Sequence, residues 1–114
     1  MLGFRDKGIL IQIIAYCERI KEKSNGIDLE IFKNDIDTRD IICFNVFQIG
    51  ELAKSLTDDF IKEYNEVPWK DIKGMRDRIA HGYGTIDFSI IWVTANEDIE
   101  ILGKYCRKIL DDNQ

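Results

Sequence analysis

The stretch that decides the fold is residues 35–56, with the sequence DIDTRDIICFNVFQIGELAKSL. Asp35 or Asp37 can begin a helix here, because a short acidic side chain accepts hydrogen bonds from the unpaired backbone N–H groups of a first turn. One face then carries apolar residues at helical spacing: Ile42, Val46, Ile49, Ala53 and Leu56. The other side adds Ile41, Phe44, Phe47 and Leu52. A helix that is apolar around much of its circumference lies in the middle of a bundle or at a subunit contact.

Two further long helices are predicted on either side of this stretch. Residues 5–23 have apolar residues at helical spacing, and the pair Asn25-Gly26 ends the helix, as glycine commonly does. Another helix begins at Pro68, because proline suits a first turn and lacks the N–H that would stay unpaired there. It runs until Gly82, where glycine weakens it.

The last long helix covers residues 88–110, behind a cap at Asp87. Its continuous apolar stripe consists of Ile91, Ala95, Ile99, Leu102, Cys106 and Ile109. Short helical turns are predicted behind a cap at Asp28 through Phe32 and, behind a cap at Thr57 or Asp58, through Tyr64. Because no segment alternates as a strand does, the fold class predicted is all-α: a bundle of four main helices plus one or two short ones.

The composition bounds the function. A chain of 114 residues with 45% hydrophobic residues and one proline suits a single domain over residues 1–114. Its net charge of −5 disfavours indiscriminate binding to nucleic acid or acidic membranes, so any RNA contact must be local. Three widely spaced cysteines indicate buried thiols in a reducing cytoplasm. The apolar run over residues 9–17 is too short to span a bilayer and has no cleavage site, so we expect no membrane association.

Residues 68–83 are basic in a chain that is acidic elsewhere, and they contain the only histidine, His81. Arginine offers phosphate a bidentate fork and histidine titrates near neutral pH, so this composition suits phosphoryl chemistry without a metal. Arg76 and His81 are five residues apart, which places them roughly 140° apart around a helix. Either two copies of the helix face each other across a two-fold axis, or the helix is distorted over residues 80–82.

The sequence Arg76-Asp-Arg-Ile-Ala-His81-Gly-Tyr83 resembles the motif of HepT-type ribonuclease toxins in the HEPN superfamily. The resemblance covers most of the chain. Further segments match family positions in the expected order: Ile49-Gly50-Glu51, Pro68-Trp69, Gly74-Met75, Ile86-Asp87 and Trp92.

This resemblance implies a HEPN-type two-fold homodimer that cleaves RNA with no metal and no cofactor, as the toxin of a toxin–antitoxin pair. Arg76 and His81 would be catalytic, with Asp77 supporting them where many relatives have Asn. The cognate antitoxin would be a nucleotidyltransferase of the MntA type, which silences the toxin by transferring AMP to Tyr83. RNA cleavage would use the 2′-hydroxyl of the substrate, either transfer or messenger RNA.

Other residues near the motif have simpler interpretations. Arg78, one turn before His81, and Lys73 are candidates for RNA contact, whereas Lys70 is interpreted as a surface residue. Glu51 either reaches the site or only lies on the surface of its helix, and the surface interpretation is favoured. A lone histidine near a helix end is otherwise most often a C-terminal cap. Trp69 and Trp92 are expected to pack in the core or at a dimer contact. The alternative function is a non-catalytic subunit that docks a nucleotidyltransferase or binds nucleotide.

Overall fold

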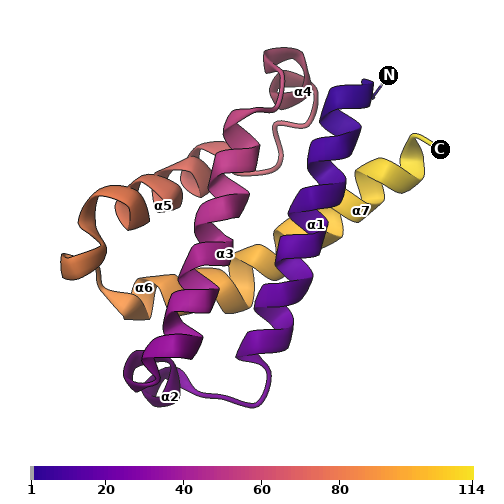
Figure 1. The fold of residues 1–114 in the computed structure, drawn as a ribbon. Coiled ribbons are helices and arrows are strands. Elements are labelled where there is room, and N and C mark those ends of the chain that lie inside the picture. Colours follow the sequence, from indigo (N-terminus) through magenta and orange to yellow (C-terminus); the bar gives the residue numbers. More distant parts are fainter. Residues whose placement is uncertain (1) are drawn as a thin grey trace.

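The computed structural model describes residues 2–114, and these are helical apart from short connections. The elements follow the chain in Figure 1 as α1 Phe4–Ser24, α2 Leu29–Asn34, α3 Ile36–Lys54, α4 Asp58–Glu63, α5 Trp69–Gly82, η1 Tyr83–Thr85, α6 Phe88–Val93, η2 Thr94–Asp98 and α7 Ile99–Asp112. The all-α prediction is confirmed for the described residues, none of which forms a strand. No helix among them combines the length and apolar character that crossing a membrane requires.

Helix α3 is central, as its apolar circumference predicts. It packs against α1 on one side and α5 on the other, while α7 packs along α1 (Figure 1). The fully buried side chains between these helices include Leu10, Ile13, Ile20, Ile42, Ile49, Ile91 and Cys106. Helix α5 is therefore supported by α3, whereas α6 packs against α2.

The helix starts agree with the predicted caps. Asp28, Asp35, Thr57 and Asp87 each accept a hydrogen bond from a backbone N–H of the first turn that follows. Two boundaries differ by a residue or two: α3 ends at Lys54 although the apolar stripe continues to Leu56, and α5 begins at Trp69, directly after Pro68.

The last predicted helix, residues 88–110, is interrupted by a π-helical turn, η2. The stripe residues Ile91, Ala95 and Ile99 are nevertheless all buried. They are spaced four residues apart, which overruns the 3.6-residue turn of an α-helix twice in succession. A wider π turn takes up the excess and keeps all three on the core side.

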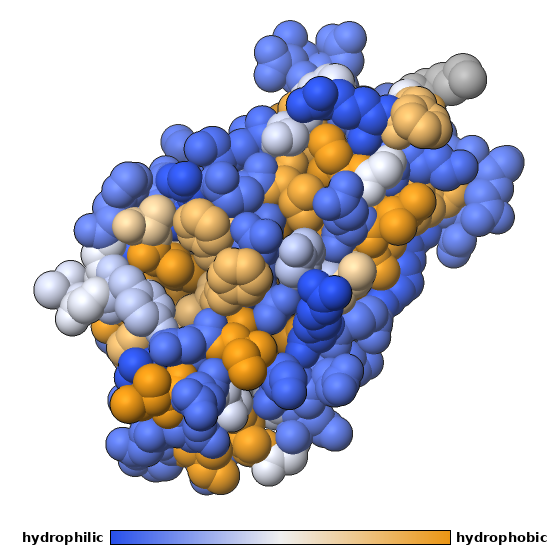
Figure 2. Space-filling view, viewed as in Figure 1, coloured by the Kyte–Doolittle hydropathy of each residue, from blue (hydrophilic) through white to orange (hydrophobic). Residues whose placement is uncertain are grey.

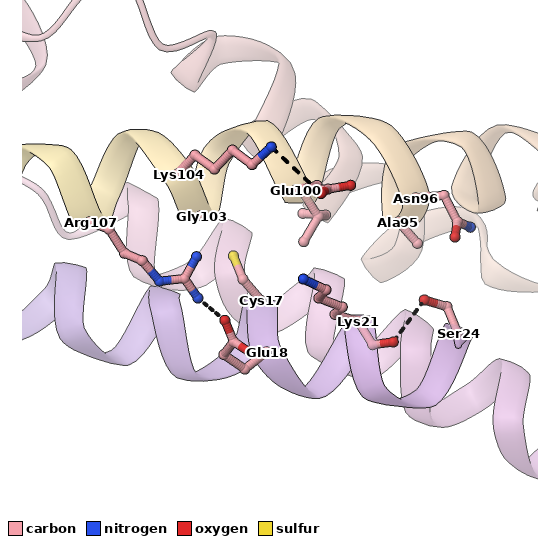
Figure 3. A pocket seen from close by; sticks show the side chains of 11 residues that line it. Cys17, Glu18, Lys21, Ser24, Ala95, Asn96, Glu100, Gly103, Lys104 and Arg107 are labelled. Carbon is pink, nitrogen blue, oxygen red and sulfur yellow. Dashed lines mark hydrogen bonds and ion pairs between the residues drawn. The ribbon is translucent and has the colours of Figure 1, made fainter. Parts of the chain in front are cut away.

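The seam between α1 and α7 holds a pocket whose walls are shown in Figure 3. The helices pack closely at Gly103, where an added Cβ would make an ordinary van der Waals contact with the Cβ of Cys17 at 3.5 Å. Arg107 reaches across to pair with Glu18. The seam contains none of the predicted site residues, so we interpret it as structural packing.

A buried carboxylate connects the start of α1 to the segment between α3 and α4. Asp6 on α1 is 6% exposed and accepts hydrogen bonds from the backbone N–H of Thr57 at 3.0 Å and from its hydroxyl at 2.7 Å. The same hydroxyl accepts from the Phe60 N–H at 3.2 Å and so caps α4. Asp6 thereby fixes the chain just after α3 ends.

Candidate functional site

The motif residues lie where α5 crosses α3 at close range. Gly50 on α3 faces the backbone of Arg76, and a Cβ at position 50 would lie 3.3 Å from the Arg76 Cα. Only glycine leaves room for this approach, because larger side chains would meet the Arg76 stem. Arg76 is consequently half-buried against α3, with a side chain that is 17% exposed.

Three groups hold the guanidinium of Arg76. Its Nε donates a hydrogen bond to Glu51 of α3, and its Nη1 donates to Asp77 at 2.9 Å. Its central carbon, Cζ, lies 5.2 Å from the ring centroid of Phe47, within the range of a cation–π contact. The hydrogen bonds to Asp77 and Glu51 raise the pKa of Arg76, so it is charged throughout the working range. The interpretation of Glu51 as a surface residue was therefore wrong: it contacts the motif arginine.

His81 lies in the last turn of α5 and is exposed. It lines an open groove between α5 and α6 together with Arg78, Asp87 and Ile90. Neither a hydrogen bond nor a shared pocket joins it to Arg76 among residues 2–114. The helix remains regular through His81 and departs from helical geometry only at Gly82, with φ −144° and ψ 25°. A distortion over residues 80–82 thus does not bring Arg76 and His81 together.

Tyr83 begins the 3₁₀ turn η1 and is held from α3. Its hydroxyl donates a hydrogen bond to Asp40, and its ring packs edge-on against Phe88 at 5.6 Å. Burial, followed by the hydrogen bond to Asp40, raises the pKa of Tyr83, so the phenol is protonated at neutral pH. Arg39 lies 4.5 Å from the Phe88 ring centroid and 3.5 Å from Asp40, which completes this cluster.

Sequence reasoning missed Arg39 and Asp40. Both are polar residues in the first half of the apolar α3, and that contrast is the signal that could have found them. Asp40 precedes Glu51 by about three helical turns, so one side of α3 places a carboxylate at each end of the motif. The motif is therefore supported by α3 at both Arg76 and Tyr83.

The predicted RNA-contact residues differ in accessibility. Arg78 is exposed and lines two adjoining hollows between α5 and α6: the groove that contains His81, and a second one whose walls include Lys70 and the exposed apolar residues Ile90 and Val93. Lys73 is half-buried and lies outside both hollows. The geometry therefore favours Arg78 over Lys73 for contact with a long polyanion.

An apolar hollow borders the site. Between Arg76 and Tyr83 lies a shallow hollow lined by Asp40, Cys43, Phe44, Phe47, Ile79 and Tyr83. Phe44 is 56% exposed at its rim. Figure 2 shows apolar side chains at the surface over α3 and α5.

The two tryptophans pack as expected. Trp69 is buried and its indole N–H donates to the Tyr64 carbonyl at 3.0 Å, and Trp92 packs against Phe32.

The site is built from arginine, histidine, tyrosine and carboxylates. Across residues 2–114, no three His, Cys, Asp or Glu side chains gather into a cluster that could hold a metal ion. The three cysteines are buried free thiols, and burial raises the pKa of Cys43, beside Tyr83, to about 11.

Comparison with known proteins identifies the family to which this arrangement belongs. Residues 13–109 match the family model described as HepT-like, ribonuclease HepT-like. A predicted RNase of Caldanaerobacter subterraneus subsp. tengcongensis is 36% identical over 101 residues, which cover 89% of this chain and 90% of that protein.

Two archaeal proteins are similar over comparable lengths. A predicted RNase of Methanocaldococcus jannaschii is 33% identical over 108 residues, covering 93% of this chain and 91% of the relative. A Thermococcus cleftensis protein described as a probable ribonuclease HepT is 34% identical over 100 residues, which cover 87% of this chain and 91% of that protein. No solved structure shows a significant match. The chain belongs to the HepT-like ribonuclease family.

Proposed function

We propose that this protein is a metal-independent endoribonuclease that works as a two-fold homodimer, with Arg76 and His81 as its catalytic residues. The observation that carries the proposal is the separation of Arg76 and His81 on one regular helix, α5. Arg76 faces α3, whereas His81 faces the groove towards α6. A second copy of α5 is the simplest way to supply the missing partner of each.

The face that two copies would share follows from helix geometry. The arc of α5 between Arg76 and His81 carries Lys73, Asp77 and Ala80. Ala80 is exposed and small, so two helices crossing there can approach closely. Arg76 of one copy would then lie near His81 of the other across a two-fold axis, and RNA would enter the cleft between the two α5 helices.

The chemistry needs only the groups present. The substrate 2′-oxygen attacks the adjacent phosphorus, and its proton passes to a histidine. As the bond from phosphorus to the 5′-oxygen breaks, that oxygen takes up a proton from a protonated His81, which leaves a 2′,3′-cyclic phosphate and a free 5′-hydroxyl. Arg76 stabilises the charge that develops on the phosphoryl oxygens. Arg78 holds the backbone of the flanking RNA.

The experiment that tests this proposal is cleavage of transfer and messenger RNA in excess EDTA, with analysis of the fragment ends. Wild-type protein should give cyclic phosphate ends, and His81→Ala and Arg76→Ala should each retain only a small residual activity. Mixing the two impaired variants should restore about a quarter of wild-type activity, because half of the dimers are then mixed and each has one intact site. A mixture that gains no activity despite subunit exchange contradicts a site shared between copies.

We further propose that the ribonuclease is a toxin, restrained by a nucleotidyltransferase antitoxin that transfers AMP from ATP to the Tyr83 hydroxyl and releases pyrophosphate. Modification would remove the proton that Tyr83 donates to Asp40 and would add a bulky anion beside the hollow that leads to Arg76. The added charge repels the RNA phosphate. Co-expression with such an enzyme should add one AMP to the wild type and none to Tyr83→Phe, and Tyr83→Phe should stay toxic in its presence.

A further inference from the structure

We infer that Glu51 is a positioning residue for RNA cleavage: it fixes the orientation of Arg76 so that the outer edge of the guanidinium meets the scissile phosphate. This inference rests on the proposed role of Arg76. The observation behind it is that Glu51 reaches Arg76 from a different helix, α3, and holds the Nε side of the guanidinium.

The hydrogen bonds of Arg76 leave a defined set of donors for a ligand. Arginine has five N–H groups, of which Glu51 takes the one on Nε and Asp77 takes one on Nη1. In the part of the chain that the structure describes, the two N–H groups of Nη2 and the second of Nη1 bind no other group. Phe47 covers one face of the plane. A phosphate therefore approaches the end of the guanidinium that points away from Glu51.

The two carboxylates do different work. Asp77 is the next residue on the same helix, and its side chain is 61% exposed, so it moves with α5. Glu51 is 39% exposed and joins Arg76 across the seam between α3 and α5. The adjacent Gly50 allows this contact by letting the Arg76 backbone lie against α3. Glu51 therefore fixes Arg76 relative to the body of the bundle, and Asp77 alone cannot.

Charge limits how strongly Arg76 can bind RNA in the ground state. Glu51 and Asp77 together outweigh its single positive charge, and Lys54, 3.7 Å from Glu51, restores the balance. A carboxylate beside the phosphate weakens substrate binding, while the fixed geometry assists the transition state. Removal of the Glu51 side chain should hence lower kcat, because positioning is lost, and also lower KM, because repulsion of the phosphate is lost; a residue that only stabilises the fold would not change KM in this way.

The test compares Glu51→Ala and Glu51→Gln in steady-state cleavage of a short labelled RNA, with thermal unfolding followed in parallel. Glu51→Ala should lower kcat by about 10- to 100-fold, since a small misplacement of a catalytic group costs that much. Glu51→Gln keeps an oxygen acceptor at the same reach, so it should retain kcat within about 5-fold and lower KM as the negative charge is lost. Glu22→Ala, an exposed glutamate on α1, serves as the control and should change neither constant.

A double-mutant cycle with Arg76 separates the possible failures. In the Arg76→Ala background, Glu51→Ala should cause no further loss of the residual activity. If Arg76→Ala cleaves like the wild type, the proposed role of Arg76 is wrong. If Arg76→Ala retains only a small residual activity but Glu51→Ala and Glu51→Gln both have wild-type constants, or if Glu51→Ala lowers that residual activity further, the inference about Glu51 is overturned. Should Glu51→Ala not fold, the kcat and KM of Glu51→Gln decide alone: retained kcat with lowered KM supports the inference, and unchanged constants overturn it.

Discussion

Gly50 of α3 lies directly against the base of the Arg76 side chain on α5: a Cβ added to Gly50 would overlap the Arg76 Cβ and lie 2.9 Å from its Cγ. Atoms this close to the backbone cannot move aside as the tip of a flexible side chain can. Since the same arginine carries the proposed chemistry, the packing of α3 against α5 and the geometry of the site depend on one missing methyl group.

Gly50→Ala should therefore destabilise the protein and reduce cleavage. The gain in helix propensity, up to about 1 kcal/mol, is smaller than the expected overpacking cost of about 1–3 kcal/mol. Urea unfolding measures the net change. Gly8→Ala in α1, where an added Cβ meets nothing within 4 Å, is the matched control and should be neutral or stabilising. A stabilised Gly50→Ala with full activity would show that α5 can shift without consequence.

Thr57→Ala should lower the free energy of unfolding by about 1–3 kcal/mol. The substitution removes the cap of α4 and leaves the buried carboxylate of Asp6 without its hydroxyl donor. Thr57→Ser retains the hydroxyl and should cost less than about 0.5 kcal/mol. Chemical denaturation of both variants checks the difference. Equal stability of the two would mean that the Thr57 hydroxyl contributes nothing to the junction of α1 and α4.

Ala80→Cys should form a disulfide-linked dimer under mild oxidation, because Ala80 lies on the arc of α5 proposed to face its copy. The native thiols will not interfere, since burial raises the pKa values of Cys17 and Cys106 to about 12 and that of Cys43 to about 11. They stay protonated at pH 8, whereas an exposed thiol is partly ionised there. Non-reducing electrophoresis gives the result. Glu22→Cys, on α1, should form no disulfide-linked dimer in the same assay. Equal crosslinking of both variants would argue against the proposed face.

Arg78→Ala should weaken RNA binding without changing the chemical step. An exposed arginine in the α5–α6 groove contributes through phosphate contact, so its loss should reduce the slope of log affinity against log salt by about 0.7 for single-stranded RNA. Titrations of the His81→Ala protein at several salt concentrations measure this slope without cleavage. Lys104→Ala on the distant α7 should leave it unchanged. An unaltered slope for Arg78→Ala would place the RNA elsewhere.

The main helices and their caps could be predicted from the sequence because local rules govern them. Asp28, Thr57 and Asp87 cap the helices that follow them, as the pattern indicates. The π turn η2 could not be predicted, because it arises from fitting four-residue spacings onto a core that the rest of the bundle defines.

The site was only partly predictable for a related reason. Arg76, His81 and Tyr83 lie together in the sequence, and their motif is visible there. Their partners Glu51 and Asp40 come from another helix, and pairing across helices depends on how α3 and α5 pack. A polar residue on an otherwise apolar helix was available as a signal, but it does not specify which partner it meets.

The contacts from Asp40 to Tyr83 and from Glu51 to Arg76 also constrain how the chain can vary in length. The two carboxylates are eleven residues apart on α3, close to three full turns, so one inserted or deleted residue between them would rotate one carboxylate by about 100° away from its partner. The number of residues between Arg76 and Tyr83 is fixed for the same reason, because both side chains must reach their carboxylates on α3. Insertions should therefore be tolerated best in the exposed turn at residues 25–26, whereas α3 and the motif should not tolerate a change in length.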